Sequence, residues 1–182
     1  MGQNFNMKRH TSSWYLLFFC VLISGCNNST PEQYFDIAVL NSNMITGFAT
    51  EGLSRELESP SVKMDEQSKQ AVPMQRSELL NSKLQYLEQS FEKLQNLKET
   101  PDTKDMLQNS VALYKYVLPV YKTEYNQLAR LYDAGGSKEA INSLTKSIHE
   151  KYFPQFDLLF TKLIASGKIY AAKHDIKVNW GL

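Results

Sequence analysis

The spacing of apolar residues along the chain predicts a protein built from amphipathic helices. The most regular stripe alternates steps of four and three residues: Leu107, Val111, Tyr114, Leu118, Tyr121, Tyr125, Leu128 and Tyr132. Such steps keep every member on one face of a helix, and their mean period of about 3.5 residues suits left-handed packing against neighbouring helices. Gly135 and Gly136 follow the stripe and predict its end, because glycine readily adopts the left-handed conformation of a helix cap.

Three further segments have helical patterns of differing quality. A second clear stripe comprises Leu80, Leu84, Leu87, Phe91 and Leu94. A third comprises Ile141, Leu144, Ile148, Tyr152, Leu159 and Leu163, with Gly167 either ending the helix or only weakening it. A ragged stripe over about residues 32–57 comprises Tyr34, Ile37, Ala38, Ile45, Phe48 and Ala49, and is weakened by Gly47 and Gly52.

The residues between the stripes predict where the helices begin. Thr30-Pro31, Thr100-Pro101 and Ser137 each combine a capping hydroxyl with a plausible first turn. Residues 58–72 are polar, without a clear period, and predict a surface loop; Pro73 marks entry to the next helix. In the tail, Ile176, Val178 and Trp180 alternate with polar residues, which is typical of an extended strap.

These elements predict an all-α fold, an antiparallel four-helix bundle with a short extended C-terminal tail. Pro119 and Pro154 interrupt good helical patterns, so two of its helices are expected to be kinked. If these helices pair about Gly135-Gly136, the two kinks lie at nearly the same level of the bundle. Aromatic residues crowd that level, and five of them would line a groove for a small apolar ligand: Tyr114, Tyr121, Tyr152, Phe153 and Phe156. The alternative is that both helices curve around a filled core, which aromatic stripes more often serve.

The N-terminus has the parts of an export signal. Lys8 and Arg9 precede a nearly unbroken apolar run from Trp14 to Ile23, about the length of a signal peptide's apolar region and too short to span a bilayer. The translation start is open, since Met7 would also give a basic beginning.

The run ends in Leu22-Ile23-Ser24-Gly25-Cys26, which resembles the lipobox of bacterial lipoproteins over the first 26 residues. The resemblance implies cleavage before Cys26, with Ile23, Ser24 and Gly25 as lipobox residues and palmitate-type acyl chains on Cys26. It divides the chain into a signal peptide (1–25), a lipidated cysteine with its tether (26–31) and a helical domain (32–182). It also implies the cell envelope, and Asn27 after the cysteine favours the periplasmic face of the outer membrane in a Gram-negative cell. An ordinary signal peptide with a chance cysteine and an uncleaved N-terminal anchor are the alternatives.

Cleavage changes the chemistry that the chain can offer. Loss of Lys8 and Arg9 leaves 18 basic against 19 acidic residues, which argues against a nucleic-acid partner. Cys20 is removed and Cys26 is acylated, so the domain has no free thiol for catalysis, disulfides or metal ligation.

Candidate catalytic motifs fail on inspection, and no cofactor or metal site is expected. His149-Glu150 begins like a zinc-protease motif, but Phe153 stands in place of the second histidine. His149 and His174 are expected at the surface. Ser90 and Ser143 each begin a Ser-x-x-Lys pattern without the partner motifs of penicillin-recognising enzymes.

The sequence therefore favours a lipid-anchored, non-enzymatic helical binding protein of the bacterial envelope, with membrane lipid and an envelope protein as its partners. The first alternative is a carrier or sensor of a small apolar ligand in the aromatic groove near Pro119 and Pro154. The second is an enzyme whose site the sequence does not identify.

Overall fold

The N-terminal third of the domain is helical but broken into three pieces. The computed structural model describes residues 2, 29–59 and 62–180. Helix α1 (Pro31–Ala38) leads into the 3₁₀ helix η1 (Leu40–Ile45), and α2 (Glu51–Glu58) follows after a turn. The prediction of one helix over residues 32–57 is therefore wrong. The break falls at Gly47 to Thr50, where Ala49 has a φ of 52° and the Gly47 and Gly52 backbones approach each other closely.

Helix starts follow the predicted caps at two of three places. The Thr30 hydroxyl accepts the Gln33 N–H while the Gln33 side chain binds the Thr30 N–H, a capping box at the start of α1. Ser137 caps α6 (Lys138–Lys173) through the Ala140 N–H. At the third place, Thr100 and Thr103 bond each other in a turn and α4 (Lys104–Val120) begins after it, three residues later than predicted.

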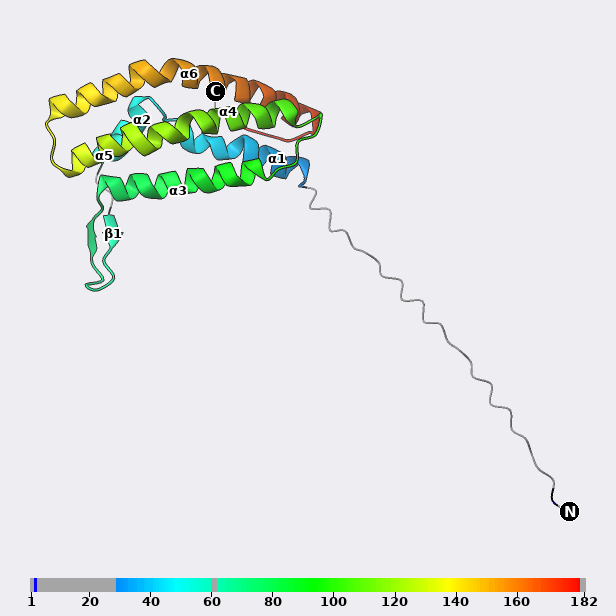
Figure 1. The fold of residues 1–182 in the computed structure, drawn as a ribbon, viewed down its shortest axis with the longest axis horizontal. Coiled ribbons are helices and arrows are strands. Elements are labelled where there is room, and N and C mark those ends of the chain that lie inside the picture. The colour runs from blue at the N-terminus through cyan, green and yellow to red at the C-terminus, as the bar shows by residue number, and fades with distance from the viewer. Residues whose placement is uncertain (1, 3–28, 60–61, 181–182) are drawn as a thin grey trace.

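A short β hairpin occupies most of the segment predicted to be a loop. Strands β1 (Val62–Met64) and β2 (Ala71–Pro73) pair antiparallel, so the described chain is mostly helical but not all-α. Three residues per strand are too few for alternation to be detected in the sequence. Asp65 accepts hydrogen bonds from the Ser68 N–H and hydroxyl in the connecting turn, and Lys63 pairs with Glu78 at the start of α3 (Arg76–Gln95). The hairpin projects from the helices (Figure 1).

The segment with the most regular stripe forms one long helical stretch containing a wider turn. Helix α4, the π-helical η2 (Tyr121–Tyr125) and α5 (Asn126–Asp133) follow without a break, and η2 begins two residues after Pro119. Proline lacks the N–H that an α-helix needs, and prolines and π-helical turns are both sites at which helices commonly bend. The stripe is the buried side of this stretch, as predicted.

Gly135 and Gly136 end α5 as the sequence predicts. The Gly136 N–H bonds the Leu131 carbonyl and the Gly135 N–H bonds the Tyr132 carbonyl, with Gly135 at a φ of 67°. These are the two bonds of a Schellman cap. Gly167, in contrast, does not end α6; a Cβ there would lie 3.0 Å from Val39, so this glycine allows α1 to pack closely against α6.

The long helical elements lie lengthwise beside one another, with α6, the α4–α5 stretch and α3 alongside the N-terminal pieces (Figure 1). The centre of the core is aromatic. Phe48 contacts four rings, with centroids 5.0–6.2 Å away, from Tyr116, Tyr121, Tyr125 and Phe156. After α6 the strap (residues 174–180) alternates half-buried Ile176, Val178 and Trp180 with exposed neighbours, as predicted, and Trp180 packs edge-on against Phe35 at 5.8 Å.

Two buried tyrosines of the core differ in how their hydroxyls are satisfied. The Tyr125 hydroxyl accepts a hydrogen bond from the Ala49 N–H at 2.7 Å. The buried Tyr114 hydroxyl makes no hydrogen bond to any described residue, although Ser90 lies close enough to lower its pKa slightly against the larger effect of burial. Burial raises the pKa of both phenols to about 12.

We expect these tyrosines to respond oppositely to loss of the hydroxyl. Tyr125→Phe leaves the buried Ala49 N–H unpaired and should lower the free energy of unfolding by about 1–3 kcal/mol. Tyr114→Phe removes an unsatisfied group and should leave the free energy of unfolding unchanged or raise it. Urea unfolding of the two matched variants measures both, and equal destabilisation would contradict the assignment.

Candidate functional site

An open hollow of about 820 Å³ lies between α2 and the first half of α6. We call it the α2–α6 groove. Side chains of α2 form one wall, those of α6 form the other, and Tyr132 of α5 contributes at one end. The wall residues are Glu51, Ser54, Arg55 and Glu58 on α2, and Asn142, Thr145, Lys146 and His149 on α6. Most of the residues that line the groove are polar or charged, whereas pockets for small molecules are usually lined by hydrophobic and aromatic residues.

The turn at Ala49 fixes the orientation of His149 in this groove. His149 Nδ1 lies 2.6 Å from the Ala49 carbonyl oxygen. A carbonyl only accepts hydrogen bonds, so Nδ1 must carry the proton, and in the neutral ring Nε2 keeps its lone pair. The imidazole also stacks on Phe153, with ring centroids 4.9 Å apart. The exposed position predicted for His149 is confirmed, and the structure adds a bond that orients the ring.

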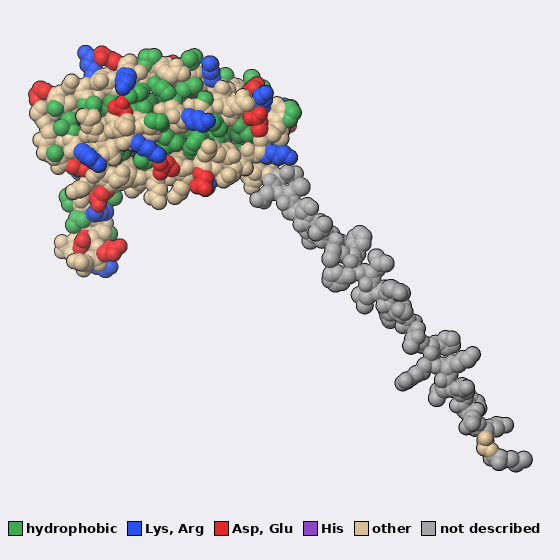
Figure 2. All heavy atoms as spheres, in the orientation of Figure 1, with side chains coloured by type: hydrophobic (Ala, Val, Ile, Leu, Met, Phe, Trp, Pro, Cys, Tyr) green, Lys and Arg blue, Asp and Glu red, His purple; other side chains and the backbone are tan. Residues whose placement is uncertain are grey.

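Both signs of charge are present in the groove, and its cations remain accessible. Arg55 pairs with Glu51 at 3.5 Å while its side chain stays 73% exposed. Lys146 pairs with Glu150 at 3.7 Å and is 75% exposed. Exposed pairs of this kind are weak and exchange readily for other partners. On the face seen in Figure 2, too, basic and acidic side chains are interspersed.

The groove offers binding groups rather than a recognisable catalytic pair. Ser54 and Thr145 hydroxyls lie 3.5 Å apart across it. Among the described residues, neither His149 nitrogen is hydrogen-bonded to a hydroxyl or a carboxylate. Nor do the described histidines, aspartates and glutamates gather in groups of three that could hold a metal ion.

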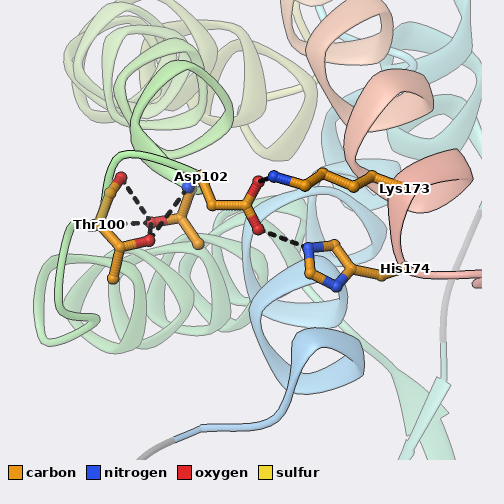
Figure 3. Close-up of polar contacts among 5 residues, drawn as sticks. Thr100, Asp102, Lys173 and His174 are labelled. Carbon is orange, nitrogen blue, oxygen red and sulfur yellow. Dashed lines mark hydrogen bonds and ion pairs between the residues drawn. The ribbon is translucent and has the colours of Figure 1, made fainter.

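A second polar cluster joins the end of α6 to the turn before α4. Asp102 accepts hydrogen bonds from Lys173 Nζ and, at 2.5 Å, from His174 Nε2 (Figure 3). The bond from Lys173, and then that from His174, hold the pKa of the Asp102 carboxyl below its usual range. Tyr170 covers the imidazole, with ring centroids 4.3 Å apart. Burial, and then the Asp102 charge, raise the pKa of Tyr170 to about 12. This arrangement fixes the point where the strap leaves α6.

A third cluster surrounds Glu124 in the π-helical turn. The carboxylate of Glu124 accepts hydrogen bonds from the Thr123 and Tyr152 hydroxyls, and Lys151 lies 3.5 Å away. Burial opposes ionisation of Glu124, but the bonds from Thr123 and Tyr152 outweigh it, so the pKa lies below its usual range. Because Tyr152 belongs to α6, the cluster ties η2 to that helix.

The five aromatic residues predicted to line a ligand groove do not all share one open space. Tyr114, Tyr121 and Phe156 are buried in the core, whereas Tyr152 and Phe153 are half-buried. The α2–α6 groove, and a smaller hollow of about 300 Å³ beside η1, are lined by other residues. This packing favours the filled core over the groove, and the carrier or sensor function stays a prediction.

The predicted lipidation site cannot be placed. Cys26 and the lipobox residues Ile23, Ser24 and Gly25 lie outside the described residues. Within the described part of the chain, none of the helices combines the length and apolar content needed to cross a bilayer.

Comparisons with protein-family models, curated proteins and solved structures found no match. Sequence reasoning missed the groove because its two walls, on α2 and α6, are more than 80 residues apart in the chain. It missed the Asp102 cluster because Lys173 and His174 lie 71 and 72 residues beyond Asp102. His174 was expected to be a surface residue, and its side chain is 23% exposed.

We expect Asp102 to contribute to stability in a pH-dependent way. Its pKa is lowered on folding, so its contribution is present above the unfolded pKa of about 3.9 and is lost as pH falls through the lower folded value. Asp102→Asn should therefore destabilise the protein near neutrality and lose less stability than wild type below about pH 4. Thermal unfolding across pH 2–7 measures the effect, with Asp157→Asn on the exposed side of α6 as control. Parallel curves for wild type and Asp102→Asn would contradict the role of this carboxylate.

Proposed function

We propose that this protein is a lipid-anchored, non-enzymatic binding protein of the bacterial cell envelope, and that its α2–α6 groove receives a segment of a partner protein. The observation that carries the proposal is the groove itself, an open hollow of about 820 Å³ with accessible charges of both signs. A polypeptide segment supplies both charges and backbone hydrogen-bonding groups, and His149 Nε2 offers an acceptor for one of its N–H groups.

The anchor would be Cys26, as the lipobox resemblance implies. Helix α1 starts at Pro31, so five residue steps separate the proposed lipid from the folded domain. Five extended residues span at most about 17 Å, which would hold the domain close to the bilayer. Asn27 favours the periplasmic face of the outer membrane, with envelope proteins as the available partners.

The scaffold that supports the groove is, in our proposal, an antiparallel four-helix bundle whose first member is the segment α1–η1–α2. The side-by-side course of the elements in Figure 1 supports this description. Bending at Pro119 is supported by the π-helical turn that begins two residues later. Pro154 lies within α6, where its missing N–H leaves the Glu150 carbonyl without its usual partner.

The anchor can be tested by removing its thiol. Cys26→Ala should release the protein from membranes or block its processing, and should abolish incorporation of labelled palmitate. Cys20→Ala is the matched control, because Cys20 lies in the segment to be removed. Palmitate incorporation by Cys26→Ala would contradict the anchor.

The groove can be tested by photo-crosslinking in intact envelopes. A photoreactive amino acid placed at Arg55 or at Lys146 should crosslink to the same envelope protein, since the two positions face one groove. The same substitution at Lys93, an exposed residue of α3, is the control.

Glu58 lies on the α2 wall of the groove. Loss of these crosslinks when Glu58 is replaced by lysine would show that the partner recognises the charges of the groove. Equal crosslinking from Lys93, or no common product from Arg55 and Lys146, would contradict the proposed binding site.

A further inference from the structure

We propose that the protein also has a lipid-docking face, through which the folded domain rests on the bilayer that holds its anchor. The face consists of the exposed side of η1 and the rim of the adjoining apolar hollow, and its principal residues are Leu40, Met44, Phe160, Ile164 and Trp180. The inference rests on the proposed acylation of Cys26 and adds to it a second, non-covalent contact with the membrane.

Exposed apolar surface beside an apolar hollow marks this face. Leu40 and Met44 are large aliphatic side chains with 39% and 42% of their surface exposed. A hollow of about 300 Å³ adjoins Leu40 and is lined by Phe160 and Ile164 of α6 and by Trp180 of the strap. Leu40 itself lines this hollow, so its exposed side chain and the apolar side chains of α6 and the strap share one surface. Exposed apolar surface on a folded domain can mark a binding site for protein or membrane.

The side chains at the rim of the hollow favour a membrane as the surface that binds this face. Trp180 is half-buried, and the Lys168 ammonium lies 5.4 Å from the centre of its ring. Tryptophan is enriched where hydrocarbon meets headgroups, and lysine extends its charge from such a site towards water and phosphate. Asp36 lies one helical turn before Leu40, so the neighbourhood is not polybasic, and apolar contact rather than net charge should drive docking.

The position of the face relative to the anchor favours the same occupant. Leu40 lies nine residues beyond the start of α1, about 14 Å along a helix. The tether from Cys26 to Pro31 spans at most about 17 Å. An anchored domain therefore holds the η1 surface within about 30 Å of the bilayer surface, so that this surface can reach the bilayer without a further partner.

The chain contains a built-in reporter for this contact. Its two tryptophans are Trp14 and Trp180, and Trp14 lies in the segment removed before Cys26. In the mature lipidated protein, all tryptophan emission comes from the proposed face. The intact mass of the purified protein establishes both the cleavage and the acylation before any fluorescence is measured.

The test uses the purified lipidated protein in phosphatidylcholine vesicles, with or without bromine on the acyl chains. We expect Trp180 emission to shift to shorter wavelength in both vesicles and to lose intensity only where the lipid is brominated. Leu40→Asp with Met44→Asp should abolish the bromine-dependent loss while leaving the protein attached to floated vesicles. Leu158→Asp is the matched control: Leu158 is 48% exposed, and two residues along α6 place it about 200° around the helix from Phe160.

Three outcomes would overturn the docking face. If the protein floats with the vesicles but bromine does not reduce Trp180 emission, the anchor is intact and only the docking face is refuted. If the shift in Trp180 emission depends on the amount of protein per vesicle and not on bromine, the occupant of the face is a second copy of the chain. Equal loss of quenching in the Leu158→Asp control would show a general effect of added charge. Failure of the mass to show acylation would refute the proposed function instead.

Discussion

The left-handed turn at Ala49 organises the domain. An L-residue held at a φ of 52° costs about 1–2 kcal/mol relative to ordinary backbone, so this conformation needs support from its surroundings. Tyr125 from η2 binds the Ala49 N–H, His149 from α6 binds its carbonyl, and Phe48 fills the centre of the aromatic core one residue before. Two elements distant in sequence, η2 and α6, thus hold the two peptide groups on either side of the Ala49 Cα. The turn separates η1 from α2, and the side chains of α2 and of the first half of α6 line the groove between these two helices.

Polar contacts also fix the C-terminal end of α6. The Asp102 carboxylate draws together Lys173 and His174, the last turn of α6 and the first residue after it. Asp175 then adopts a φ of 53°, and the chain doubles back as the strap that carries Trp180 to Phe35. The proposed docking face therefore depends on a carboxylate in a different part of the chain. Cations at the end of α6 also lie where the helix dipole favours positive charge.

The sequence was most informative where one periodicity dominated. The stripe from Leu107 to Tyr132 was assigned correctly as a buried face, and Gly135-Gly136 as its end, because both signals are local. The interpretation of residues 32–57 as one helix was wrong because Gly47, Gly52 and the support of Ala49 by Tyr125 act together, and the last contact spans 76 residues. The hairpin was missed because its strands are three residues long. The groove was beyond local reasoning altogether, since Arg55 and Lys146 become neighbours only through the fold.

The hairpin stands at the end of the molecule away from the first residue of α1 (Figure 1). Its tip, from Asp65 to Gln70, is polar and held by its own hydrogen bonds, with no part in the buried core. Exposed turns of this kind accept inserted residues without unfolding the domain. An epitope or fluorophore inserted there would lie at the end of the molecule away from the first residue of α1 (Figure 1). The distance of such a label from a surface would therefore report how the protein is tilted relative to that surface.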